Sequence, residues 1–218
     1  MITAVIGIKQ ISERVENKNL RILGGQPLFC WIIDTLLSVG QISEIVINAD
    51  GKELIKQLNN KYGNKIIVIE REDELKGHDV PMNKIILSSL GSCANEIILN
   101  THVTNPFLKA GTIENAIKSY SLEKNSVFSV SEYQSRFYTS DLKPINHDPG
   151  VLLKTQNLDP LYEENSLMYI FSKKDFLQNR NRISKESRPF ITPKLESIDI
   201  DTEDDWLLST KLVQNLIK

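Results

Sequence analysis

The chain has 218 residues, of which 40% are hydrophobic and 25% charged, and its formal net charge is −2; these values are typical of a globular domain. This charge gives no bulk attraction to nucleic acid or to an acidic membrane, and no segment approaches the roughly 20 apolar residues of a membrane span. Cys30 and Cys93 lack metal-ligand spacing, so we expect reduced thiols and a cytoplasmic protein.

Short apolar runs rich in β-branched residues predict the strands of a sheet. These runs cover residues 3–8, 44–49, 65–70, 96–100 and 126–130. The stretches between them carry apolar residues at helical spacing. The predicted helices cover residues 27–40, 52–63, 83–92 and 112–121. Strands that alternate with helices indicate an α/β fold, with a mostly parallel sheet covered by helices on both faces.

The pattern changes after Val130. Residues 131–165 are polar and contain Pro144, Pro149, Gly150 and Pro160. A plain loop of this length is improbable inside a compact domain. We therefore interpret this segment as an insertion with short β-hairpins and a role of its own, such as a dimer arm or a wall of the site.

The last part of the chain returns to regular patterns. Residues 167–177 predict a strand and a short helix, and residues 195–201 alternate like a strand. Residues 206–217 predict an amphipathic helix. Thr202 and Asp205 have the spacing of a capping box before this helix, with Asp in place of the usual Glu.

Charged residues gather after the predicted strands, where ligands bind in open parallel sheets. The chain offers there Lys9, Arg14, Lys18, Asn19, Asp50, Arg71, Asp199 and Asp201. Clustered cations indicate a phosphate site. Asp199 and Asp201 are two residues apart on a predicted strand, so their side chains face the same way and suit one hard cation such as Mg²⁺, with phosphate oxygens completing its shell. The cluster therefore points to a nucleoside triphosphate and its metal.

Each of these features also has a plainer interpretation. Cations in an exposed loop are usually only solvated, and aspartates before a helix often only complement its dipole. His102 and His147 are typical loop histidines. Composition alone does not decide between the two interpretations.

The order of six motifs resembles the acylneuraminate cytidylyltransferase family, to which the CMP-Kdo synthetases are related. The first loop covers residues 9–19 and matches the family pattern at Ser12, Arg14, Lys18 and Asn19. Lys9 replaces an arginine of that pattern, and residues 10–11 replace a glycine pair. The other matching stretches are residues 23–28 (LGGQPL), 48–50 (NAD), 102–106 (HVTNP), 162–169 (YEENSLMY) and 199–205 (DIDTEDD).

The resemblance implies a three-layer α/β/α Rossmann-like nucleotidyltransferase fold with a β-rich dimerisation insertion. Residues 1–218 would form a single domain, and residues 131–165 would make dimer contacts and part of the sugar site. The implied reaction transfers CMP from CTP to a 2-keto sugar acid, a sialic acid-like nonulosonic acid, with release of pyrophosphate and with Mg²⁺ as cofactor. The alternatives are action on Kdo or on a sugar or alditol phosphate, and a degenerate relative that only binds nucleotide.

The resemblance also implies roles for individual residues. The catalytic residues would be Lys9, Arg14, Lys18 and Asp201. The nucleotide would be bound by Ile8, Lys9, Ser12, Arg14, Lys18, Asn19, Asp50 and Arg71, and the metal by Asp199 and Asp201. The sugar acid would be bound by His102, Thr104, Asn105, Arg136, Lys154, Gln156, Glu164, Asn165 and Tyr169. Within that set, Lys154 or Arg136 would pair with the sugar carboxylate.

Overall fold

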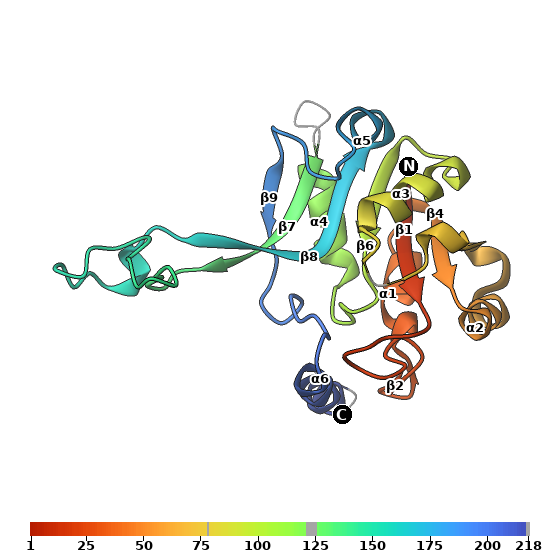
Figure 1. Cartoon of the computed structure of the whole chain (residues 1–218), viewed down its shortest axis with the longest axis horizontal. Coiled ribbons are helices and arrows are strands. Elements are labelled where there is room, and N and C mark those ends of the chain that lie inside the picture. The colour runs from red at the N-terminus through yellow and green to blue at the C-terminus, as the bar shows by residue number, and fades with distance from the viewer. Residues whose placement is uncertain (78, 121–125, 217–218) are drawn as a thin grey trace.

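A seven-stranded sheet with the strand order β5-β4-β1-β6-β8-β7-β9 forms the centre of the protein (Figure 1). The computed structural model describes residues 1–77, 79–120 and 126–216. The strands are β1 (Ile2–Lys9), β4 (Ile42–Asp50), β5 (Ile67–Glu70), β6 (Ile97–Thr101), β7 (Ser126–Tyr133), β8 (Leu161–Ser172) and β9 (Arg188–Ile191). Strand β8 runs antiparallel to β6 and β7, and the remaining pairs are parallel. The five strands predicted before residue 131 are all present, whereas the edge strand β9 was not predicted.

Helices cover both faces of the sheet, as the alternating pattern predicted. They are α1 (Leu28–Leu37), α2 (Lys52–Tyr62), α3 (Met82–Ser89), α4 (Ala110–Ser119), α5 (Lys173–Asn179) and α6 (Glu203–Leu216). Ser121 and Ile217, at the ends of two predicted helices, lie outside the described residues. None of the described helices combines the length and the apolar character needed to cross a membrane.

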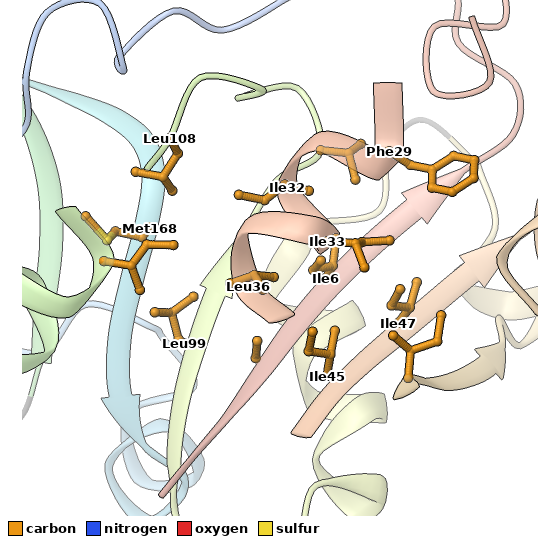
Figure 2. Close-up of a cluster of buried hydrophobic side chains, with 14 of the residues drawn as sticks. Ile6, Phe29, Ile32, Ile33, Leu36, Ile45, Ile47, Leu99, Leu108 and Met168 are labelled. Atoms are coloured by element: carbon orange, nitrogen blue, oxygen red, sulfur yellow. The ribbon is translucent and has the colours of Figure 1, made fainter. Parts of the chain in front are cut away.

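Side-chain alternation along β1 divides the core into two layers. Ala4, Ile6 and Ile8 belong to one buried cluster with residues of α1, α2 and α4, while Val5 belongs to a second cluster with residues of α3 and α5. Figure 2 shows the first layer, where Ile32, Ile33 and Leu36 of α1 lie over the strands. This arrangement gives a three-layer α/β/α sandwich and confirms the predicted fold class.

The segment between β7 and β8 forms an arm that extends far from the body of the molecule (Figure 1). Both strands run into the base of this arm, where Tyr133 pairs with Leu161. A single bridge between Tyr138 and Pro144 lies further out. The predicted insertion is therefore not a plain loop.

Helix α6 packs against the loop that follows β1. Val15 of this loop is buried with Ile200, Trp206 and Val213. The short hairpin β2 (Ile22–Leu23) and β3 (Gln26–Pro27) lies beside the same helix (Figure 1). This contact brings the end of the chain to the first loop.

The start of α6 confirms the predicted capping box. The backbone N–H of Thr202 donates to Asp205 Oδ2 at 2.8 Å, and the backbone N–H of Asp205 donates to Thr202 Oγ1 at 3.3 Å. The predicted strand at residues 195–201 is wrong. Its first residues form a turn closed by the carbonyl of Pro193, which accepts from the backbone N–H groups of Glu196 and Ser197, so they have no ladder partner.

Candidate active site

Two segments from distant parts of the sequence meet at the carboxyl edge of the sheet. Lys18 Nζ lies 3.1 Å from Asp201 Oδ1, and it also donates to the backbone carbonyl of Ile200 at 2.5 Å. Arg14 Nη2 lies 3.0 Å from the same Asp201 oxygen. The Lys18 side chain is 10% exposed and that of Arg14 is 67% exposed. The first loop and the late aspartates therefore face each other across one site, as the sequence predicted.

A pocket of about 310 Å³ lies beside this ion-pair cluster. It is lined by Gly7, Lys9, Ser12, Glu13, Arg14, Lys18, Asn19, Met82, His102, Val103 and Thr104. The first loop lacks the family's glycine pair and is held by the burial of Val15 and by Asn19 Nδ2, which donates to the carbonyl of Lys9 at 2.7 Å. Lysine and arginine side chains, rather than a glycine-rich backbone, give the pocket its positive charge.

Several buried polar atoms of this region have no partner. Within the described chain these include Ser12 Oγ, Asn19 Oδ1 and Asp199 Oδ1. Burying an unsatisfied polar atom costs about 1–3 kcal/mol, so such atoms together in one site indicate that a ligand satisfies them.

The two late aspartates fit the predicted cation site. Burial raises the pKa of Asp199, and the neighbouring Asp201 carboxylate raises it further, against a hydrogen bond from Thr104. A cation between the two carboxylates would remove that cost. Among the described residues no cluster of three His, Cys, Asp or Glu side chains could hold a metal, so other oxygens, such as those of phosphates, must complete the shell. The predicted strand is absent, but Ile200 between the two aspartates is buried, and the Asp201 carboxylate is near enough to act on the pKa of Asp199.

Arg71 lies below the pocket and does not line it. Its Nε donates to Asn48 Oδ1 at 2.9 Å, and its Nη2 donates to the carbonyls of Ile8 and Asn48 at 3.2 and 3.0 Å. Burial lowers the pKa of Arg71. The guanidinium therefore ties the ends of β1 and β4 together, and a direct contact with nucleotide stays a prediction, as it does for Ile8.

Gln10, one of the residues that replace the glycine pair, has a structural role. Its Oε1 accepts from the backbone N–H of Leu54 in the first turn of α2 at 3.3 Å, and its backbone N–H donates to the carbonyl of Asp50 at 2.7 Å. A Cβ atom on Gly51 would lie 2.4 Å from Gln10 Cβ. The glutamine thus fills the space over the turn that begins α2.

His102 lines the pocket on the side of β6. Burial and the positive charges of Arg182 and Lys18 lower its pKa to about 4, against the opposing effect of Asp201. The imidazole is therefore neutral near pH 7. Thr104 lines the same wall, and its carbonyl accepts from the backbone N–H of Ile200 at 2.9 Å. Asn105 is buried behind this wall, and its amide atoms have no partner among the described residues.

Glu164, Asn165 and Tyr169 lie on β8, next to β6. Tyr169 is fully buried and donates to Glu164 Oε1, while burial raises the pKa of its phenol to about 12. Asn165 Nδ2 donates to the hydroxyls of Ser131 and Thr192 at 3.1 and 2.7 Å. These β8 side chains are held by protein partners and do not line the pocket.

Arg136, Lys154 and Gln156 belong to the arm. Arg136 Nη2 donates to the carbonyl of Leu153, another arm residue, and Lys154 and Gln156 are exposed. The arm points away from the body (Figure 1), so within one chain these residues do not join the pocket.

Arg182 was not predicted from the sequence, and its guanidinium contacts both His102 and Tyr169. Arg182 stands in a polar stretch after α5, and no spacing pattern links it to either residue. Only the fold brings them together.

Comparison with known proteins identifies the class. The family model described as cytidylyltransferase matches residues 6–205. The chain belongs to the cytidylyltransferase family and is therefore a CTP-dependent nucleotidyltransferase. The resemblance inferred from the motifs is confirmed.

The chain is also similar to individual proteins of this class. The chain is 29% identical to the CMP-N,N'-diacetyllegionaminic acid synthase of Legionella pneumophila, over 98% of this chain and 96% of that protein. It is 27% identical to the N-acylneuraminate cytidylyltransferase of Streptococcus agalactiae, covering 93% of this chain but 51% of that protein, so it spans about half of that relative. The fold is similar to that of a CMP:2-keto-3-deoxy-manno-octonic acid synthetase solved with CTP, with a TM-score of 0.70, 14% identity and 98% coverage of both chains.

Proposed function

We propose that the protein transfers CMP from CTP to a nonulosonic acid, a 2-keto sugar acid, and releases pyrophosphate. The observation that carries this proposal is the meeting of Arg14 and Lys18 with Asp201 beside a pocket whose buried polar atoms lack partners. The names of the relatives that cover the chain support the sugar class.

The reaction asks the protein mainly for positioning and charge neutralisation. The anomeric hydroxyl oxygen of the sugar acid forms a bond to the α-phosphorus of CTP as it loses its proton. The bond between that phosphorus and the bridging oxygen breaks, and pyrophosphate leaves with the electron pair. Lys9, Arg14 and Lys18 hold the triphosphate and stabilise the charge on the leaving group. Ser12 Oγ and Asn19 Oδ1, which line the pocket without partners in the described chain, bind polar groups of the nucleotide.

Asp199 and Asp201 would hold Mg²⁺. When bound, this ion neutralises phosphate charge and polarises the attacking hydroxyl. Asp201 Oδ1 is within 3.1 Å of both Arg14 and Lys18. Arrival of the triphosphate offers these cations a stronger anion, so they turn from the aspartate to the phosphates and free the carboxylate for the metal.

The arm completes a homodimer in this proposal. Residues 1–218 form one cytidylyltransferase domain, and the insertion at 131–165 reaches a second copy. Leu142 and Leu152 of the arm are 80% and 89% exposed, and burial of such side chains against a second copy stabilises a dimer. Arg136, Lys154 and Gln156 then act in the partner's sugar site.

We place the enzyme in the cytoplasm, where CTP is made. Cys30 and Cys93 are buried free thiols, which suits a reducing compartment.

The decisive experiment measures pyrophosphate release with CTP, Mg²⁺ and a panel of acceptors. The panel contains N-acetylneuraminic acid, N,N'-diacetyllegionaminic acid, pseudaminic acid, Kdo and sugar and alditol phosphates. We expect turnover with a nonulosonic acid. Turnover with Kdo alone or with a phosphate alone would favour the alternative acceptors, whereas CTP binding without pyrophosphate from any acceptor would indicate a degenerate relative.

A further inference from the structure

Arg182 is a partly buried cation held on several sides. Its guanidinium carbon lies 3.6 Å from the centroid of the Tyr169 ring. Its Nη1 donates to Asn100 Oδ1 at 2.9 Å and lies 3.4 Å from His102 Nε2. The contacts come from β6, from the loop that follows it and from β8, so the guanidinium sits at the junction of these elements.

The partners of Arg182 are themselves fixed. Asn100 is fully buried, and its Nδ2 donates to the carbonyl of Val5 at 3.0 Å, so its Oδ1 faces the arginine. The Tyr169 ring is fully buried and bound through its hydroxyl to Glu164. A guanidinium stacked and bonded in this way presents its remaining N–H groups in a fixed direction.

Within the part of the chain that the structure describes, no carboxylate forms an ion pair with this cation. In the same part of the chain, Nε and Nη2 of Arg182 have no acceptor. Burial lowers the pKa of Arg182, whereas Tyr169 and Glu164 act in the opposite direction. A partly desolvated charge without a counter-ion is costly, which indicates that the missing anion arrives with a ligand.

Chemistry limits where the sugar carboxylate can lie. In a 2-keto sugar acid the carboxylate is bonded to the anomeric carbon, whose hydroxyl attacks the α-phosphorus. The carboxylate must therefore lie a few bond lengths from the α-phosphorus, in or beside the pocket that His102 and Thr104 help to line. His102 lies between Arg182 and the pocket. Arg182 contacts His102, and His102 lines the pocket.

We propose that Arg182 binds the carboxylate of the sugar acid through its free fork of N–H donors. Lys154 and Arg136, which were predicted for this role from the sequence, lie on the arm and would reach a sugar only in the partner's site, whereas Arg182 lies beside His102 in the same chain. The inference rests on the proposed function, and it names the group that selects acids over neutral sugars.

The test compares N-acetylneuraminic acid and N,N'-diacetyllegionaminic acid with their C1 carboxamides, which keep the shape but lack the charge. Wild type, Arg182→Met, Arg182→Lys and the control Lys185→Met are assayed for pyrophosphate release, and binding of each acid and amide is measured by calorimetry. Lys185 is exposed in the same loop, so the control removes the same charge. Thermal unfolding reports whether each variant is folded.

We expect wild type to prefer the acid about 10- to 100-fold in KM, because charge-assisted bonds are lost with the amide. Arg182→Met should lose this preference, with a smaller change in kcat. Arg182→Lys should keep part of the preference, and Lys185→Met all of it. If Arg182→Met does not fold, the partial loss in Arg182→Lys decides the question.

Each remaining outcome is also decisive. A folded Arg182→Met protein with the wild-type ratio of acid to amide would overturn the assignment. If wild type releases no pyrophosphate with any acceptor, the proposed function is wrong. The role of Arg182 is then tested only by whether calorimetry shows tighter binding of the acid than of the amide. Wild type that binds acid and amide equally would refute the carboxylate role even where turnover is normal.

Discussion

Lys18 Nζ lies 3.1 Å from Asp201 Oδ1, although 183 positions separate the two residues in the sequence. The pairing depends on the packing of α6 against the first loop, where Val15, Ile200 and Trp206 share one buried cluster. The position of Lys18, which we propose to bind phosphate, therefore depends on the packing of α6 against the first loop.

Replacing Lys18 by Met tests this pairing. We expect kcat/KM to fall about 10²- to 10³-fold, because a cation on the leaving group is lost. Unfolding should become easier by about 1–3 kcal/mol, since the Ile200 carbonyl loses its donor. Pyrophosphate release and urea unfolding measure the two effects. The matched control is Lys56→Met, at an exposed position of α2, and equal activity in both variants would contradict the role of Lys18.

Replacing Asp201 by Asn tests the metal assignment. The substitution keeps the size of the side chain but removes the charge, so turnover should fall by about 10²-fold or more and higher Mg²⁺ should be needed. A chelator should abolish the activity of wild type. Asp204→Asn, at an exposed position in the first turn of α6, should titrate with Mg²⁺ like wild type. A fully active Asp201→Asn protein would exclude Asp201 as a metal ligand.

Much of the fold followed from local patterns, whereas parts of the site did not. The helix at residues 28–37 and the box of Thr202 and Asp205 depend on neighbours in sequence, so they could be predicted. The strand at residues 195–201 was wrong because its turn around Pro193 prevents ladder pairing. Arg182 was missed because its partners lie on other strands, and long-range contacts leave no periodic signal.

The predicted arm and its β-hairpin character followed from composition, but its direction did not. Turn residues indicate that a segment leaves the sheet, and they do not say where it goes. Arg136 and Lys154 were therefore assigned to the sugar site from motif order alone. The sequence does not give the distance between the arm and the pocket.

His102 makes stability depend on pH. In the unfolded chain its pKa is about 6.5, and in the folded protein burial and nearby cations lower it to about 4. Between these values the unfolded state binds more protons, so stability falls as the pH falls. From pH 6.5 to pH 5 the loss from His102 is on the order of 2 kcal/mol.

The substitution His102→Gln should remove that part of the pH dependence. The free energy of unfolding in urea, measured at pH 6.5 and pH 5, checks this. His147→Gln, which alters a histidine of the arm, should keep the slope of the wild type. An unchanged slope in His102→Gln would show that His102 titrates normally.

A substitution on the surface of the arm should alter the assembly of two chains into a dimer. Leu152→Glu places a charge on a residue that is 89% exposed in one chain, so it should leave the fold intact but dissociate the dimer that we propose. Sedimentation should show a monomer, and the KM for the sugar acid should rise because the partner's arm is absent. The control is Leu207→Glu on α6, at a position that is 54% exposed. A wild-type monomer, or a dimer in both variants, would refute the role of the arm.

The pairing of the first loop with Asp201 also has a consequence for synthesis of the chain. A growing polypeptide contains β1, β4, β5 and β6 long before Asp201 has been added. During that interval Arg14 and Lys18 have neither Asp201 as a counter-charge nor α6 as a support. The first four parallel strands are thus synthesised well before the residues that complete the proposed triphosphate pocket.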